Sequence, residues 1–357
     1  MAKLLLAGYF GAGNLGDDAI LKGFAEGLGD TPYQYRALAG SAERLMRNLG
    51  IPGVPRMDLG SVKNAISECD ALVFPGGSIF QDVTSTKSVA YYSGLVKEAK
   101  KANKKVILLG QGVGPLNGFL GKRMAAAAFN AADMIAVRDP GSVSVLRSLG
   151  VKGTPRVTAD CAFLLPVPPK DEASTSFGVA GMKTIGISVR PWGKKNSKEV
   201  VRAFADLVML LSKNGYVPVL MPMDAEEDAK VIDEIAKLHG GKVPDLKGLA
   251  TPAQFQQRVG RMEAVIAMRL HAGILAATVG IPPMMVSYDP KVTAFSNLIG
   301  LPAPPNVQGV TGDRLFAQFQ SFVKDREPHA RTVERRLGEL KAAAGGNIQA
   351  LRDCLGA

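Results

Sequence analysis

Near its amino end the sequence reads LLLAGYFGAGNLGDDAIL (residues 4–21), an apolar run that leads through glycines into a helix-like segment. Gly11, Gly13 and Gly16 have the spacing GxGxxG. Glycines at such a turn let the backbone approach a ligand closely, and the amino end of the next helix attracts anions. A strand, a glycine-rich turn and a helix in this order predict the first unit of a parallel α/β sheet.

The residues around this turn argue against a dinucleotide ligand. A dinucleotide fold places an acidic residue about 20 positions further on, at the end of the second strand, but the stretch TPYQYRALAG (residues 31–40) contains none. Asn14, Asp17 and Asp18 add polar and negative groups that would repel a pyrophosphate. We therefore expect Gly13 and Asn14 to belong to a loop for hydroxyl-bearing ligands, with helix capping by the two aspartates as the alternative.

Strand and helix patterns alternate along the rest of the chain, which is typical of parallel α/β sheets. We expect strands at residues 4–10, 71–75, 106–110, 134–137, 157–159, 184–189, 217–222, 264–268 and 284–287. Helices are expected at residues 19–28, 89–101, 142–149, 198–214, 224–238 and 272–279. A segment rich in Pro, Ser and Gly interrupts the alternation. It predicts an amino-terminal domain (1–165), a linker (166–183), a second α/β domain (184–325) and a helical segment (326–357).

Further candidate residues follow the strands of the first half, where ligands of parallel sheets bind. FPGGSIFQD (74–82) contains Gly76 and Gly77, and LGQGVGP (109–115) contains Gln111. Arg138 ends a strand just before Asp139 and Pro140, so it is either a ligand-binding cation or an ion-pair partner of a neighbouring acid.

The second half places cations at one sheet edge. Arg269, Leu270 and His271 directly follow an expected strand and precede an apolar helix. A guanidinium and an imidazole beside a helix amino terminus predict an anion site, because arginine forms a fork for phosphate or carboxylate and histidine can transfer a proton. Arg190 and Lys291 follow two other strands and would complete the site. Ion pairs with Asp289 or Glu263 are the alternative role for these cations.

Composition limits the classes of function. The 357 residues include 43 Lys and Arg against 32 Asp and Glu, a net charge of +11, with 46% hydrophobic residues. These values describe a folded globular chain. Three widely spaced cysteines and three histidines favour neither a disulfide scaffold nor a metal site, so we expect no metal and no cofactor. We find no export or membrane-spanning segment, and a cytoplasmic location is expected.

The positive charge is partly clustered. Lys97, Lys100, Lys101, Lys104 and Lys105 form one group, Lys194, Lys195 and Lys198 a second, and Arg331, Arg335 and Arg336 a third. They are either solvated helix faces or a contact with anionic lipid or a polyanion. No recognition motif for nucleic acid accompanies them, and we expect none to bind.

Seven of these segments together resemble the polysaccharide pyruvyl transferases, most of all the bacterial cell-wall type, CsaB. They are GYFGAGNLGDDAIL (8–21), FPGGSIFQD (74–82), LGQGVGP (109–115), AVRD (136–139), ISVRPW (187–192), MRLHAGILAATVGIP (268–282) and SYDPK (287–291). The resemblance implies a GT-B-like fold, with two Rossmann-like domains of mostly parallel strands facing across a cleft. It also implies transfer of a pyruvyl group from phosphoenolpyruvate to two hydroxyls of a sugar, giving a ketal and phosphate.

The resemblance further implies roles for single residues. Arg269, Leu270 and His271 match the family's motif for phosphoenolpyruvate, and Lys291 matches its lysine. Arg138 or Arg190 matches a further arginine. We expect His271 to act as general acid, the cations to hold the donor, and Asp17 or Asp18 to orient the acceptor or act as base.

In the cell-wall type the acceptor is N-acetylmannosamine of a lipid-linked polymer precursor, ketalised at its 4 and 6 hydroxyls. Such an acceptor would explain the basic clusters as a peripheral contact with the anionic inner face of the cell membrane. Two alternatives remain: a GT-B glycosyltransferase that uses a nucleotide sugar, with Glu263 or Asp289 on the ribose, and a non-catalytic protein that binds glycans or other polyanions.

Overall fold

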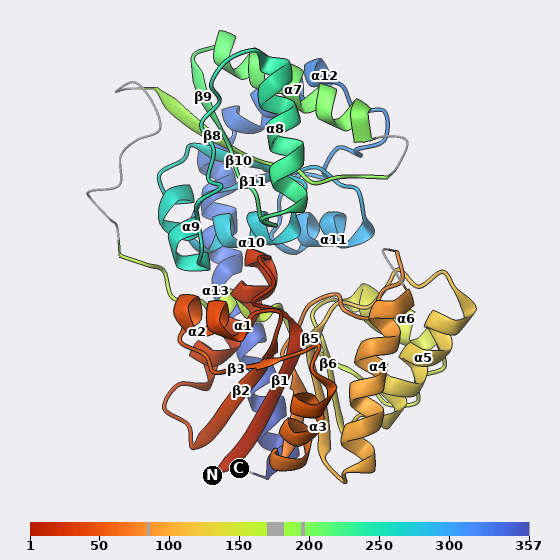
Figure 1. Ribbon diagram of the computed structural model, residues 1–357. Coiled ribbons are helices and arrows are strands. Elements are labelled where there is room, and N and C mark those ends of the chain that lie inside the picture. The colour runs from red at the N-terminus through yellow and green to blue at the C-terminus, as the bar shows by residue number, and fades with distance from the viewer. Residues whose placement is uncertain (84–85, 170–181, 194–196, 357) are drawn as a thin grey trace. The chain divides into compact units, whose positions relative to one another are not determined.

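A computed structural model describes residues 1–83, 86–169, 182–193 and 197–356. The chain forms two compact units (Figure 1). Unit 1 comprises Met1–Pro166 and Leu340–Ala357, and unit 2 comprises Val167–Glu339. Most of the expected linker, residues 170–181, lies outside the described residues, as do Lys194 and Lys195 of the second basic cluster.

Unit 1 contains a parallel sheet of seven strands in the order β3-β2-β1-β4-β5-β6-β7. The strands are β1 (Ala2–Phe10), β2 (Tyr33–Ala39), β3 (Gly53–Pro55), β4 (Ala71–Phe74), β5 (Lys105–Gln111), β6 (Met134–Val137) and β7 (Arg156–Val157). β1 lies inside the sheet, third from one edge, and later strands extend the sheet in both directions. This order is typical of a doubly wound fold.

Helices cover both faces of this sheet (Figure 1). One face packs against α3 (Leu59–Glu68), α4 (Thr86–Lys101), α5 (Phe119–Ala131) and α6 (Pro140–Ser148). The other packs against α1 (Leu15–Leu28), α2 (Ala42–Leu49), the short 3-10 helix Cys161–Leu164 and the end of α13 (Arg326–Leu355). Leu5 contributes to the first core and Leu4 and Leu6 to the second, because successive side chains of a strand point to opposite faces.

Unit 2 contains a parallel sheet of four strands in the order β11-β10-β8-β9. The strands are β8 (Lys183–Ser188), β9 (Tyr216–Leu220), β10 (Ala264–Ala267) and β11 (Pro283–Met285). The helices are α7 (Ser197–Lys213), α8 (Glu227–His239), α9 (Pro252–Val259), α10 (Leu270–Thr278), α11 (Pro290–Leu298) and α12 (Gly312–Lys324). α7 packs on α8 and α12, and α10 packs on α9, β10 and β11.

The last helix, α13, is continuous but contributes to both units. Its end is fixed in unit 1 by Asn347, which is fully buried. The Asn347 amide donates to the Ala159 carbonyl oxygen at 2.8 Å, and its oxygen accepts from Thr158 Oγ1 at 2.8 Å. Buried amides need such partners, so these bonds fix the position of this end of the helix. No helix within the described ranges is both long enough and apolar enough to cross a bilayer.

Candidate active site

The predicted site residues of unit 2 leave neighbouring strands at their carboxyl ends. Arg269 follows β10, in which all four residues are buried, and it is the amino-terminal cap residue of α10. His271 therefore lies in the first turn of that helix and is half-buried. Arg190 follows β8 and Lys291 follows β11, the two strands that pair with β10. Parallel pairing thus brings the three chain segments to one edge of the sheet.

Arg269 is held by an acidic residue that the sequence did not single out, Asp228 in the first turn of α8. Its Nε lies 3.2 and 3.0 Å from the two Asp228 carboxylate oxygens, and Nη2 lies 2.5 Å from Oδ1. Asp228 is fully buried and also accepts from the Met223 and Asp224 backbone N–H groups at 3.0 and 3.1 Å. These two backbone hydrogen bonds fix the orientation of the Asp228 carboxylate that pairs with Arg269.

The pair fixes both the charge and the direction of Arg269. Burial lowers the pKa of Arg269, but the charge and hydrogen bonds of Asp228 outweigh it and raise the pKa above its ordinary value. Nη1 takes no part in the Asp228 fork or in the 3.4 Å contact of Nη2 with Glu227. A bidentate arginine pair therefore leaves one guanidinium nitrogen available for an anion.

Tyr288 connects the other two cations of this unit. Arg190 Nη1 donates to the Tyr288 hydroxyl at 2.9 Å, and the guanidinium carbon lies 4.7 Å from the ring centroid. Lys291 Nζ lies 5.7 Å from the same centroid. Burial raises the pKa of Tyr288, but the charges of Lys291, Arg190 and Arg269 outweigh it, and the pKa lies below its ordinary value. Three cations thus act on one phenol.

The acidic residues proposed as ion-pair partners of these cations have other partners or weak contacts. Glu263 pairs with Lys183 at 2.8 Å and Arg326 at 3.5 Å. Asp289 caps α11 by accepting from the Lys291 N–H at 3.0 Å, and its carboxylate lies 3.8 Å from Lys291 Nζ. Leu270 is 7% exposed and packs in the interior. Arg190, Arg269 and Lys291 therefore form a cationic group around Tyr288, next to the amino ends of α10 and α11.

The glycine turn of unit 1 is organised by Asn14 and Asp18. Asn14, rather than either aspartate, caps α1: its side-chain oxygen accepts from the N–H groups of Gly16 at 2.9 Å and Asp17 at 3.3 Å. Asp18 is buried and accepts from the Gly11 N–H at 2.8 Å. Burial raises the pKa of Asp18 to about 7.

The raised pKa of Asp18 gives a prediction for stability. The folded state retains the proton of Asp18 between its unfolded pKa, near 4, and about 7, so the wild type loses stability as pH rises through that window. Asp18→Asn keeps an oxygen to accept from Gly11 and has no proton to lose. We expect its stability advantage over the wild type to grow by about 2–3 kcal/mol between pH 5 and pH 8 in urea unfolding.

Asp58 supplies the control for this measurement. It is an exposed cap of α3, and its side-chain hydrogen bond with Ser61 lowers its pKa. Asp58→Asn should therefore gain nothing as the pH rises. An Asp18→Asn advantage that stays constant from pH 5 to pH 8 would show that Asp18 is ionised throughout.

Asp17 lies against a second glycine turn of unit 1. Gly76 and Gly77 follow β4 with φ of +152° and +96°. A Cβ atom built on Gly77 would lie 3.6 Å from Asp17 Oδ1, an ordinary van der Waals distance, so this turn lies beside the carboxylate, and the positive φ is what favours glycine here. Asp17, Asn14 and the glycines of both turns thus lie at the carboxyl edge of the unit 1 sheet.

Gln111 and Arg138 are engaged within unit 1. The Gln111 amide donates to the carbonyl oxygens of Phe74 at 3.1 Å and Leu109 at 2.9 Å. Arg138 is 6% exposed, and its Nη1 donates to Asp160 at 2.8 Å while Nη2 donates to Ser78 Oγ at 2.8 Å. Its contact with the adjacent Asp139 is longer, 3.9 Å. These bonds favour the ion-pair alternative for Arg138, with Asp160 as its principal partner.

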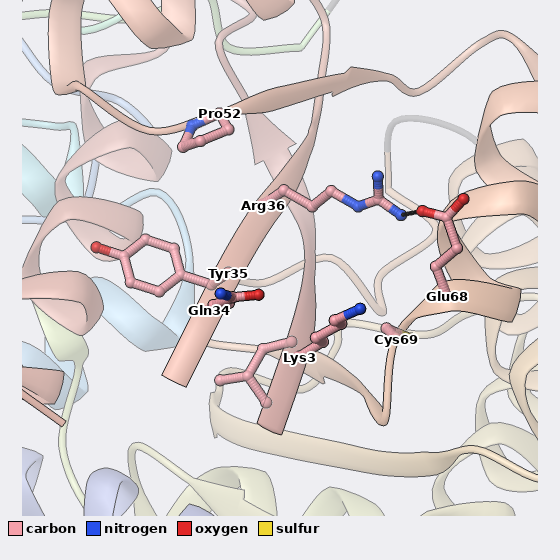
Figure 2. A pocket seen from close by; sticks show the side chains of 8 residues that line it. Lys3, Gln34, Tyr35, Arg36, Pro52, Glu68 and Cys69 are labelled. Atoms are coloured by element: carbon pink, nitrogen blue, oxygen red, sulfur yellow. Dashed lines mark hydrogen bonds and ion pairs between the residues drawn. The ribbon is translucent and has the colours of Figure 1, made fainter. Parts of the chain in front are cut away.

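A pocket of about 360 Å³ lies at the other end of the same sheet, where β1 and β2 begin (Figure 2). Lys3, Gln34 and Arg36 line it, and an ion pair of 2.6 Å joins Arg36 to Glu68. None of the predicted site residues borders this pocket. In the part of the chain that the structure describes, no three His, Cys, Asp or Glu side chains are grouped to hold a metal ion.

Comparison with known proteins identifies the family. The sequence profile described as "Polysaccharide pyruvyl transferase" matches residues 14–290, more than half of the chain. The chain belongs to the polysaccharide pyruvyl transferase family. The matched range contains every predicted site residue except Gly13 and Lys291, which lie one residue beyond its ends. A curated relative, the amylovoran biosynthesis protein AmsJ of Erwinia amylovora, is 24% identical over 421 residues and covers 98% of each chain.

Solved structures confirm the fold of this pyruvyl transferase family member. A UDP-GlcNAc 2-epimerase from Neisseria meningitidis, bound to UDP-GlcNAc, matches 99% of this chain and 100% of its own, with 12% identity and a TM-score of 0.62. The ADP-heptose LPS heptosyltransferase II of E. coli matches 92% of this chain and 100% of its own, with 14% identity and a TM-score of 0.51. The fold is of the GT-B type, as the family resemblance implied, and the likeness concerns the fold alone.

Proposed function

We propose that this transferase moves a pyruvyl group from phosphoenolpyruvate to two hydroxyls of a sugar, forming a ketal and releasing phosphate. The observation that carries the proposal is the cationic group of Arg190, Arg269 and Lys291 around Tyr288. Phosphoenolpyruvate carries a carboxylate and a phosphate on a small carbon frame, and several fixed cations beside helix amino ends match such an anion. Family membership supports pyruvyl transfer in polysaccharide biosynthesis.

The proposed chemistry assigns one proton transfer to His271. As general acid it gives a proton to the methylene carbon of phosphoenolpyruvate while a sugar hydroxyl oxygen bonds to the adjacent carbon. The bond from that carbon to the phosphate oxygen then breaks, and the second hydroxyl oxygen takes the place of the phosphate. Each hydroxyl loses its proton as it bonds to the carbon: one of these protons replaces the one given by His271, and the other goes to the leaving phosphate. Arg269, Arg190 and Lys291 stabilise the charge of the phosphate as it leaves.

We assign the acceptor to the glycine turns of unit 1. Asp17 and Asn14 lie beside Gly13, Gly76 and Gly77, and their oxygens can accept hydrogen bonds from sugar hydroxyls. Asp17 is the better candidate for the base, because Asp18 is buried and bonded to the Gly11 backbone.

The proposed acceptor is N-acetylmannosamine in a lipid-linked precursor of a secondary cell-wall polymer, as in the CsaB type. The reaction would take place in the cytoplasm, with the protein bound peripherally to the inner face of the membrane. The basic excess of the chain, +11, is compatible with that location.

The test is phosphate release from phosphoenolpyruvate, with and without an N-acetylmannosamine acceptor that carries a lipid-like tail. We expect release that depends on the acceptor and a product with the mass of the sugar plus the pyruvyl ketal. Binding of UDP-sugars, with no binding of phosphoenolpyruvate in calorimetry, would instead favour a nucleotide-sugar glycosyltransferase. Polymer binding that ignores phosphoenolpyruvate would favour a glycan-binding protein.

A further inference from the structure

We propose that an exposed apolar tip of unit 1, formed by Val83, Phe119 and Leu120, docks on an anionic phospholipid surface. These side chains are 61%, 70% and 66% exposed. Val83 lies between β4 and α4, and Phe119 and Leu120 begin α5. Large apolar side chains are costly to leave in water, so a cluster of them marks a contact surface.

A hydrogen-bonded clamp brings the parts of the tip together. Asp82 accepts from the backbone N–H groups of Asn117 at 2.8 Å and Gly118 at 2.7 Å. A Cβ atom on Gly121 would lie 2.7 Å from Asp82 Oδ2, so the first turn of α5 packs closely against this carboxylate. Val83 follows Asp82 directly. The loop after β4 and the start of α5 are thereby fixed to one another, with their apolar side chains outward.

The rest of α5 explains why these side chains stay outside. The helix buries Gly121, Ala125, Ala128 and Phe129 against the sheet, which leaves its first two residues beyond the core. A glycine, Gly118, precedes the helix and makes no side-chain cap. Packing in the core therefore does not account for Phe119 and Leu120 at these positions.

Two cations lie beside the tip. Lys122 and Arg123 are exposed in the first turn of α5, the Arg123 guanidinium carbon lies 5.6 Å from the Phe119 ring centroid, and α5 contains no acidic residue. Apolar side chains with adjacent lysine and arginine fit the boundary of an anionic bilayer, where cations meet phosphates and apolar groups enter the acyl region. A symmetric contact between two copies would instead bring like charges together.

The tip is a different surface from the lysine cluster of residues 97–105, which the sequence indicated as a candidate membrane contact. Lys100 and Lys101, at the opposite end of α4, form ion pairs of 2.9 Å with Asp133 and Glu98. The tip, by contrast, lies at the carboxyl edge of the unit 1 sheet, the edge that carries the proposed acceptor turns. The inference rests on the proposed function in one respect: a lipid-linked acceptor would explain why the protein binds a membrane. The exposure and the charges of the tip are independent of that function.

The test is flotation of the full chain with vesicles of phosphatidylglycerol and phosphatidylcholine, compared with phosphatidylcholine alone. Phe119→Ser/Leu120→Ser should reduce partitioning onto the anionic vesicles by about tenfold or more. Lys122→Glu/Arg123→Glu should reduce it by about tenfold and remove the preference for anionic lipid. The matched control is Met57→Ser/Leu59→Ser, an apolar pair that is 78% and 69% exposed near α3 and should leave partitioning unchanged.

Equal partitioning of Phe119→Ser/Leu120→Ser and the wild type would overturn the proposal. So would a change in sedimentation of that variant without a change in flotation, because the tip would then bind a second copy. Phosphate release with a water-soluble acceptor tests the proposed reaction separately. We expect the tip variant to keep that activity and to lose it only with an acceptor embedded in vesicles.

Discussion

Replacing His271 by alanine should lower turnover of phosphoenolpyruvate by about 100- to 10 000-fold, the usual contribution of a general acid. The affinity of the variant for phosphoenolpyruvate should fall much less than its turnover, because Arg190, Arg269 and Lys291 supply the charges that hold the donor. The effect should therefore lie mainly in kcat rather than in KM. Initial rates of phosphate release at varied phosphoenolpyruvate give both constants.

His239 provides a matched control for this variant. It is half-buried in the same unit, and it is the last residue of α8 rather than a residue that follows a strand. His239→Ala should keep the wild-type rate. If His271→Ala also kept that rate, the proton would have to come from another group, and the assignment of His271 would be wrong.

The strands were the most predictable part of the fold. Runs such as residues 71–75 and 264–268 are apolar throughout because parallel strands are buried on both faces, and the structure places strands at both. β2 and β3 were both missing from the expected strands, because only the last three residues of β2 are buried, and β3 has only three residues and includes Pro55. The helix starts were less accurate: α10 begins at Leu270 rather than Ala272, so His271 lies within the helix.

Because ligands of parallel sheets bind at the carboxyl ends of the strands, the sequence also indicated the cations of unit 2. It did not indicate the residues that hold them. Asp228 is 41 residues from Arg269 in sequence, and Tyr288 is 98 residues from Arg190. In sequence, Asp228 is one of several acidic residues at the start of a helix, where they ordinarily complement the helix dipole. Tyr288 lies in the SYDPK segment, where no pattern assigns it a role. Their contacts depend on packing between separate elements, which periodicity does not encode.

Asp228→Ala should lower the stability of the protein and weaken donor binding, because it leaves the buried Arg269 guanidinium without its partner. Breaking one side of a buried ion pair costs about 3–5 kcal/mol in the free energy of unfolding. The guanidinium should also lose its fixed direction, and KM for phosphoenolpyruvate should rise by about tenfold or more as its contact with the anion weakens. Asp228→Asn keeps one acceptor oxygen and should show a smaller loss of stability with a similar rise in KM.

The exposed pair of Asp233 and Lys247 separates this effect from a general weakening of α8. Asp233 lies on the same helix, but its ion pair is exposed to solvent, so Asp233→Ala should cost less than about 1 kcal/mol and leave KM unchanged. Urea unfolding and phosphate-release kinetics on the three variants give the comparison. A destabilised Asp228→Ala enzyme with the wild-type KM would make Asp228 a purely structural residue. A raised KM in Asp228→Asn, at nearly wild-type stability, would instead show that its charge positions Arg269 for the donor.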